Sequence, residues 1–129
     1  MTRPSTPEPV DLAALAGDML AAARAASAGR AARAVHSGAG LLRQNLLALV
    51  AGAELAAHDS PPEATLQVLS GRIRLQGQDR AWELGAGHLL PIPPERHSVA
   101  AIDDSVFLLT VRRDAAPPTG DLDREAPTG

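Results

Sequence analysis

The sequence contains no cysteine, no lysine and no tyrosine, and its only large aromatic side chains are Trp82 and Phe107. The absence of cysteine excludes disulfides, thiolate zinc sites, iron–sulfur clusters and cysteine nucleophiles, so a metal would need histidine, carboxylate or water ligands. Its 12 basic residues are outnumbered by 15 acidic ones, and with so few aromatic rings the chain has neither a stacking platform nor a basic stripe. We therefore expect no binding of nucleic acid.

The chain also lacks an uninterrupted apolar run of membrane-spanning length. Prolines punctuate residues 1–9, and the alanine-rich stretch behind them carries Asp11, Asp18 and Arg24. This pattern predicts no signal peptide, no membrane association and a cytoplasmic location. A length of 129 residues, 45% of them hydrophobic, with a net charge of -3, is typical of one globular domain.

The composition predicts a helix followed by a larger β domain, between two flexible tails. The tails, at 1–9 and 114–129, are rich in proline, glycine, threonine and charge. Residues 10–28 repeat apolar side chains with a period of about 3.6, which predicts a helix that begins at Asp11 and ends at Gly29. Its expected apolar face comprises Leu12, Leu15, Ala16, Met19, Leu20 and Ala23.

Beyond this helix, short apolar runs alternate with glycine, proline, aspartate and serine at intervals of about 8 to 12 residues, which is typical of an all-β sandwich or barrel. This barrel is expected to span residues 30–113. The expected strands are 31–36, 42–51, 54–58, 65–70, 72–76, 80–84, 88–92, 96–102 and 105–112.

Turn residues and alternation refine this prediction. The links 70–71 and 77–79 contain glycine and favour tight hairpins, because glycine reaches the positive φ that such turns need. In the strand at 72–76, alternation places Ile73 and Leu75 inside and the arginines between them outside. Trp82 is expected to pack under the N-terminal helix or in a subunit contact.

The stretch from Gly52 to Gly71 resembles the first of two sequence motifs of the cupin superfamily. That motif runs glycine, five residues, His-x-His, three or four residues, glutamate, six residues, glycine. Gly52 and His58 keep the first spacing, and the segment Val-Leu-Ser-Gly-Arg-Ile at 68–73 is very similar to the end of the motif.

The second cupin motif runs glycine, five residues, Pro-x-Gly, two residues, histidine. Gly87 and the segment Pro-Pro-Glu-Arg-His at 93–97 follow it with one residue fewer and without the glycine. The resemblance covers residues 42–112 and implies a small, single-domain, RmlC-like cupin: a mainly β, double-stranded β-helix (jelly-roll barrel), here with one N-terminal α-helix. Glu95 and Arg96 are expected to form a local ion pair at the rim.

In metal-binding cupins, the two histidines and glutamate of the first motif and the histidine of the second form the metal site. The resemblance carries this role to His58 and His97. Ser60 stands at the second histidine position and Ala64 at the glutamate position. Two imidazoles with water make a weak site, so Fe, Mn, Zn or Ni would need a third ligand.

Two residues are candidates for that third ligand. Glu63 is one position from the required glutamate, and it reaches inward only if a bulge lies between it and Gly71, since a shift of one residue reverses the face of a strand. His36 could contribute if the first strand crosses the barrel mouth near His58. The alternative for His36 is a surface residue beside a turn.

These residues favour a binding module, whose barrel cavity holds a small molecule at His58, Ser60, His97 and Gln44 without a tightly bound metal. The alternative is a metal-dependent cupin enzyme, a dioxygenase or isomerase, that uses the two histidines and a third ligand. A third hypothesis is a regulatory or stress-response partner that acts through its helix, so that deleting residues 1–28 removes the effect and leaves the barrel folded. The resemblance also implies a homodimer, because short cupin barrels usually pair through a sheet.

Overall fold

The computed structural model describes residues 7–113, and it is mainly β with one helix in that range. The elements, in chain order, are α1 (Leu12–Ala25), β1 (Arg30–His36), β2 (Leu42–Leu49), β3 (Glu54–His58), β4 (Glu63–Ser70), β5 (Arg72–Gln76), β6 (Ala81–Gly85), β7 (Leu89–Pro91), β8 (His97–Ala101) and β9 (Ser105–Arg112). The tails expected at 1–9 and 114–129 fall outside the described residues, apart from 7–9. Over the described range, no helix is long and apolar enough to cross a membrane.

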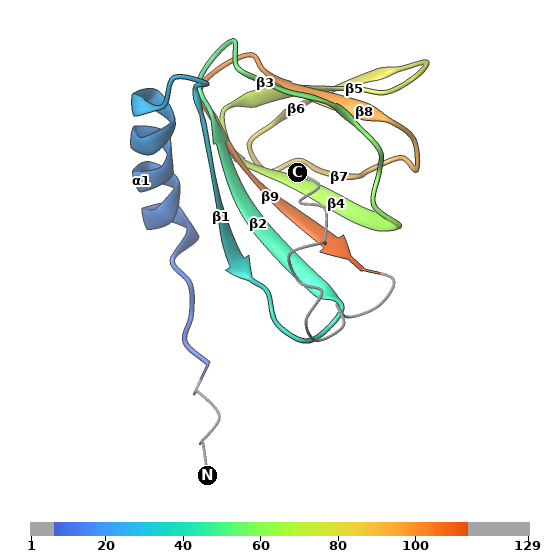
Figure 1. Cartoon of the computed structure of the whole chain (residues 1–129). Coiled ribbons are helices and arrows are strands. Elements are labelled where there is room, and N and C mark those ends of the chain that lie inside the picture. The colour runs from blue at the N-terminus through green and yellow to red at the C-terminus, as the bar shows by residue number, and fades with distance from the viewer. Residues whose placement is uncertain (1–6, 114–129) are drawn as a thin grey trace.

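The strands form two antiparallel sheets, which Figure 1 shows as two facing layers. One sheet has the order β1-β2-β9-β4-β7 and the other the order β3-β8-β5-β6, so the chain crosses repeatedly from one layer to the other. This is the jelly-roll arrangement, and the expected fold class is confirmed. Each strand lies within two residues of its expected ends, because alternation and turn residues carry the strand signal.

Helix α1 packs on the outer face of the five-stranded sheet, over β1 and β2 (Figure 1). It begins after Asp11, whose carboxylate accepts a hydrogen bond from the backbone N–H of Ala14 at 3.0 Å. Met19 and Ala23 are buried against Leu46 of β2. The expected apolar face is confirmed in full, comprising Leu12, Leu15, Ala16, Met19, Leu20 and Ala23. An isolated helix of 14 residues is only marginally stable in water, so most of the stability of α1 comes from its docking on the sheet.

An ion pair also holds the end of α1 to the barrel. The Arg24 guanidinium lies 2.9 Å from the Asp104 carboxylate, in the turn between β8 and β9. The same carboxylate accepts a hydrogen bond from the backbone N–H of Ala51 at 2.8 Å. The Ala51 hydrogen bond, and then the hydrogen bond from Arg24, lower the pKa of Asp104. Asp104 therefore joins three segments, the helix end and two turns.

The helix ends at Ala25, before the Gly29 that the sequence indicated, and Ala26 caps it in an extended conformation. Gly29 instead forms the turn into β1, with φ 72°. A Cβ there would lie 2.7 Å from Cγ2 of Val50. The glycine is thus required by the close approach of the residue after β2, and not by the helix cap.

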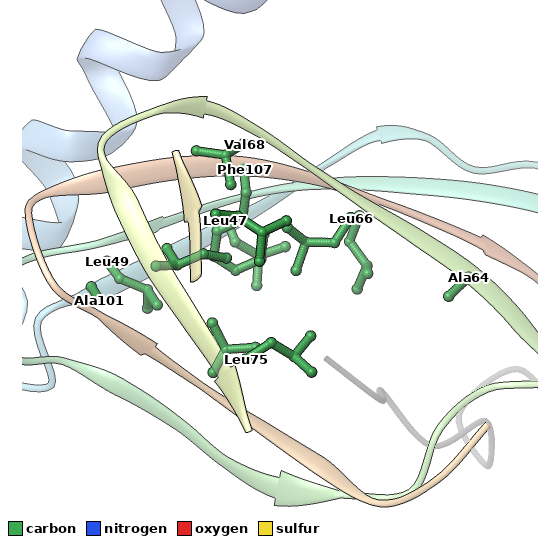
Figure 2. Packing of buried hydrophobic residues seen from close by; sticks show 12 residues of the cluster. Leu47, Leu49, Ala64, Leu66, Val68, Leu75, Ala101 and Phe107 are labelled. Atoms are coloured by element: carbon green, nitrogen blue, oxygen red, sulfur yellow. The ribbon is translucent and has the colours of Figure 1, made fainter. Parts of the chain in front are cut away.

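The inner faces of the two sheets enclose the main hydrophobic core (Figure 2). Phe107 of β9 is its largest fully buried side chain, and Ile73 and Leu75 of β5 are 0% exposed. The arginines that alternate with them are exposed, as expected. Figure 2 shows Ala64 at one end of this cluster, apart from the other labelled side chains.

Only one of the two expected hairpins forms. The link 77–79 joins the paired strands β5 and β6, and the N–H of Gly77 donates to the carbonyl of Arg80 at 2.8 Å. The hairpin expected at 70–71 is wrong, because β4 and β5 belong to different sheets. Gly71, with φ 86°, turns the chain from one sheet into the other. A Cβ there would meet the carbonyl of Asp104 and lie 2.7 Å from Cα of Ser105.

Trp82 lies on β6, in the sheet that faces away from α1. It is half-buried against the main core, and the guanidinium of Arg80 lies 4.9 Å from its ring centroid. The expected packing under the helix is therefore wrong, since the helix covers the other sheet.

Candidate functional site

His58 and His97 lie side by side at the end of the barrel. They are cross-strand partners on β3 and β8, and their ring centroids are 4.7 Å apart with an interplanar angle of 61°, an edge-to-face contact. His97 is 3% exposed, and His58 is half-buried. A bulge between Leu55 and His58 adjusts the register of β3 just before the pair. Motif positions distant in sequence are thus brought into contact.

Backbone carbonyls orient both imidazole rings. Nδ1 of His97 donates to the carbonyl of Glu95 at 2.9 Å, and Nδ1 of His58 donates to the carbonyl of Ala56 at 3.0 Å. A carbonyl only accepts, so each Nδ1 carries its proton and the Nε2 of the neutral ring carries the lone pair. Each ring is therefore held in the tautomer that accepts a hydrogen bond, or ligates a metal, through Nε2.

The residues before His97 tie this end of the barrel to two neighbouring loops. The carboxylate of Glu95 accepts a hydrogen bond from the N–H of Gln78, in the hairpin between β5 and β6, at 2.6 Å. Arg96 pairs with Asp59 at 3.2 Å. The local ion pair expected between Glu95 and Arg96 does not form, because each binds a different loop.

The other two positions of the cupin ligand set hold no metal ligand here. Ser60 lies in the link after β3, half-buried, and its hydroxyl donates to the carbonyl of Pro61 at 3.0 Å. Ala64 lies on the inner face of β4 and is 6% exposed. Within residues 7–113, no group of three histidine or acidic residues is placed to hold a metal ion. The donor set is two imidazoles, which does not fit a tightly bound metal.

Glu63 does not supply the missing ligand. Its ladder with β9 runs without interruption from Glu63 to Val68, and the irregularity lies between Val68 and Ser70. Glu63 therefore points to the face opposite Ala64, where its carboxylate accepts a hydrogen bond from Nε of Arg112 at 2.8 Å. A bulge does precede Gly71, as the hypothesis required, but it leaves Ala64 rather than Glu63 facing inward.

His36 is also placed elsewhere. It ends β1, the outermost strand of the five-stranded sheet, and it is exposed. His58 belongs to the other sheet. The hypothesis that His36 completes a site with His58 is therefore wrong, since the first strand does not cross the barrel mouth.

Gln44 lies on the wrong side of its strand for the expected role. It shares a face of β2 with Leu46, which packs against α1, and its amide donates to the hydroxyl of Thr110 at 3.1 Å. The expectation that Gln44 lines the barrel interior is corrected by this alternation.

The neighbours of Gln44, which the sequence interpretation missed, face inward instead. Arg43 pairs with Val111 and Asn45 with Leu109, and both partners pack in the main core. Both side chains are half-buried. The signal was present in the sequence, because counting back in twos from the apolar residues 47 and 49 reaches 45 and 43.

A hollow of about 350 Å³ lies at the strand ends beside this site. Its lining comes from the start of β2 and the residue before it, the start of β4 and the end of β9, and it includes the ion pair of Glu63 with Arg112. Neither His58 nor His97 lines it. The hollow is therefore separate from the surroundings of the histidine pair.

Comparisons with known proteins support the fold and leave the chemistry open. No family model and no curated protein matches the sequence. Among solved structures, a conserved protein of unknown function from Streptococcus pyogenes aligns with a TM-score of 0.63 and 22% identity, over 70% of this chain and 80% of that one. A cupin superfamily protein from Desulfitobacterium hafniense aligns with a TM-score of 0.61 and 15% identity, over 66% and 78% of the two chains.

A third solved structure, an RmlC-like cupin protein from Desulfovibrio desulfuricans, aligns with a TM-score of 0.58 and 25% identity, over 64% of this chain and 81% of that one. These similarities agree with the two-sheet topology. The protein thus has the cupin fold, in its small, single-barrel, RmlC-like form, and the resemblance seen in its sequence is confirmed.

Proposed function

We propose that this protein binds a small molecule inside the barrel, at the end that carries His58 and His97, and that it does so without a resident metal. One observation carries the proposal: two imidazoles are in contact, each with Nδ1 held by a backbone carbonyl and each with an Nε2 lone pair. Such preset hydrogen-bond acceptors beside an apolar core are typical of ligand sites, where few polar groups orient a largely apolar contact.

The donor set disfavours the alternative of a metal-dependent dioxygenase or isomerase. A catalytic metal needs about three protein ligands besides its open positions. Alanine and a serine bonded to the backbone stand at the remaining positions, and the two candidate replacements, Glu63 and His36, point elsewhere. The binding hypothesis needs none of these ligands.

Elemental analysis tests the metal-free part of the proposal. Untagged protein, purified without chelator, is measured by inductively coupled plasma mass spectrometry beside the double variant His58→Ala/His97→Ala. The variant His36→Ala is the matched control, because it removes an exposed histidine of the other sheet. We expect metal well below one per chain in all three. Near-stoichiometric metal that only the double variant loses would overturn this part and favour the enzyme.

Binding itself is tested by NMR with isotope-labelled protein and a library of small polar molecules. We expect ligands to shift the imidazole signals of His58 and His97 and to leave those of His36 unchanged. The same ligands should lose affinity for the double variant while its melting temperature stays within the range of the control. Ligands that shift only surface residues, or none that bind, would contradict the proposal.

The hypothesis of a partner that acts through its helix needs a different test from the deletion of residues 1–28. Removing α1 would expose Leu46, Ala48 and Val106, which are 0% exposed under it. The barrel would therefore lose its outer core together with the helix. Substitutions on the exposed side of α1, such as Asp18→Arg, test the hypothesis without this damage.

The homodimer also stays a prediction. It is supported by the outer face of β4 and β7, where Leu89 is 55% exposed. Light scattering coupled to gel filtration checks it. We expect a dimer that Leu89→Arg weakens, and a monomeric wild type would contradict it.

A further inference from the structure

The two carbonyls that orient the imidazole pair lie in different surroundings. Nδ1 of His58 donates to the carbonyl of Ala56, which belongs to β3. Nδ1 of His97 donates to the carbonyl of Glu95, which lies in the link 92–96 between β7 and β8. Strand β3 therefore holds the carbonyl that orients His58, whereas the carbonyl that orients His97 depends on the contacts of the link.

The side chain of Glu95 fastens this link to the hairpin between β5 and β6. Its Oε2 accepts a hydrogen bond from the backbone N–H of Gln78 at 2.6 Å, a short distance, as expected for a charged acceptor. Figure 1 shows the hairpin and the β7–β8 connection at the same end of the barrel. The N–H of Glu95 donates to the carbonyl of Pro93 at 2.7 Å, and Pro93 and Pro94 fix two φ angles. With the backbone restricted in this way, the position of the Glu95 carboxylate constrains the position of its carbonyl.

The hairpin admits the carboxylate because residue 77 is a glycine. A Cβ at Gly77 would lie 2.5 Å from Oε2 of Glu95 and 3.2 Å from Cζ3 of Trp82. The N–H of Gly77 donates to the carbonyl of Arg80 at 2.8 Å, and the Arg80 guanidinium lies 4.9 Å from the centroid of the Trp82 ring. The φ of Gly77 is not positive, so what this position requires is the absence of a side chain.

The link has a second carboxylate contact, on the side of β3. Arg96 pairs with Asp59 at 3.2 Å and donates to the carbonyl of Ala57 at 3.1 Å. The Asp59 side chain is 88% exposed, and ion pairs in water contribute little. The link is thus held by a short carboxylate contact to the hairpin and by an exposed one to the residue after His58.

We propose that Glu95 is the positioning residue of the histidine pair: its carboxylate, held by the hairpin, fixes the carbonyl that keeps the proton of His97 on Nδ1. The position of the hairpin thereby sets whether Nε2 of His97 is a hydrogen-bond acceptor. The consequence for a ligand rests on the proposed function, and it makes the hairpin 77–79 a segment through which binding is regulated.

NMR of the protein without any ligand tests the positioning, because the ¹⁵N shifts of an imidazole show which nitrogen carries the proton. The buffer is alkaline enough to keep the imidazoles neutral. We expect His58 and His97 of the wild type to be protonated on Nδ1. Glu95→Ala is expected to give His97 a share of the Nε2–H form on the order of a tenth or more, and to leave His58 unchanged. Glu95→Gln should recover most of this loss, because a carboxamide oxygen also accepts from the N–H of Gln78.

Two further variants separate the carboxylate contact from a general loosening of the link. Gly77→Ala keeps the charge of Glu95 but displaces its carboxylate from the hairpin, so we expect His97 to change as it does in Glu95→Ala. Asp59→Ala is the matched control, because it removes the other carboxylate bound to the link, and it should leave His97 unchanged. The amide proton of Gln78 should move upfield in Glu95→Ala and keep its position in Asp59→Ala.

An unchanged tautomer of His97 in both Glu95→Ala and Gly77→Ala would overturn the inference, as would an equal change in Asp59→Ala. If Glu95→Ala does not fold, Gly77→Ala decides the question. A wild type whose His97 already carries its proton on Nε2 would overturn both the inference and the proposed function. Because no ligand is added, a library that yields no molecule at His97 would overturn the proposed function alone.

Discussion

The glycine at the corner between the two sheets gives the sharpest test of the structure. Gly71 and Gly52 have nearly the same positive φ, 86° and 87°. A Cβ at Gly52 meets nothing within 4 Å, whereas a Cβ at Gly71 meets the carbonyl of Asp104 and both the side chain and the Cα of Ser105. The variants Gly52→Ala and Gly71→Ala therefore both place an alanine at a positive φ. Only Gly71→Ala also creates a steric clash.

The magnitudes follow from these contacts. An alanine held in the left-handed region costs about 1–2 kcal/mol, offset by roughly 0.4–1 kcal/mol because the unfolded chain also loses freedom, so Gly52→Ala should cost about 1 kcal/mol. Gly71→Ala must also displace Ser105, which is 0% exposed and whose hydroxyl accepts from the N–H of Arg72 at 2.9 Å and donates to the carbonyl of Asp103 at 2.7 Å. Losing these bonds adds about 2–3 kcal/mol.

Urea unfolding of both variants, followed by circular dichroism, measures the free energy of unfolding, and calorimetry gives the melting temperature. We expect Gly71→Ala to be less stable than Gly52→Ala by about 2–3 kcal/mol, or roughly 10 °C for a domain of this size. If Gly71→Ala is too unstable to purify, Ser105→Ala reports the hydrogen-bond part alone. Equal losses in the two glycine variants would refute the reasoning, because they would show that the corner relaxes without cost.

Three further predictions concern the rest of the molecule. The folded-state pKa of Asp104 is lowered, so its contribution is present above the unfolded pKa of about 3.9 and is lost as pH falls through the folded value; the stability of Asp104→Asn, measured by urea unfolding from pH 7 down to the acid range, should depend less on pH than that of wild type. Ala23→Leu, at a position that is 0% exposed, should destabilise by about 1–3 kcal/mol by overfilling the contact with β2, whereas the exposed Ala22→Leu should change little in thermal unfolding. Ala64→Glu, which puts a carboxylate back at the glutamate position of the cupin motif, should raise the affinity for Zn²⁺ or Ni²⁺ in a competition titration by about tenfold or more, and no gain would contradict the expectation that this position shares a site with the two imidazoles.

The sequence predicted the helix and the strands because helical period, strand alternation and capping depend on residues that are neighbours in the chain. The period of α1 identified every residue of its buried face, and Asp11 caps it as expected. Alternation in β5 placed Ile73 and Leu75 in the core. The two motif histidines were also found by sequence, since their spacing from glycines follows the family pattern. Elements and candidate residues thus depend on interactions within a few residues.

The errors have two sources, a strand alternation that was not followed and a turn whose glycine is required by a distant strand. Gln44 was assigned to the interior although Leu47 and Leu49, on the same strand, indicate that even-numbered positions face α1. The turn at Gly71 has the composition of a hairpin, but its glycine is required by the approach of Ser105 from β9. The first fact could have been read from alternation along β2, whereas the second could not, because it involves a contact between segments far apart in the chain.

By itself, the sequence determined the β domain, the amphipathic helix, the cupin resemblance and the loss of two of the four ligand positions, since composition, periodicity and motif spacing are properties of the chain alone. Only the tertiary structure decided which faces of β2 and β4 are inside. It excluded His36 and Glu63 as ligands and placed the two imidazoles 4.7 Å apart. It also placed Arg43 on an inner face, because the register between strands sets which side chains share a surface.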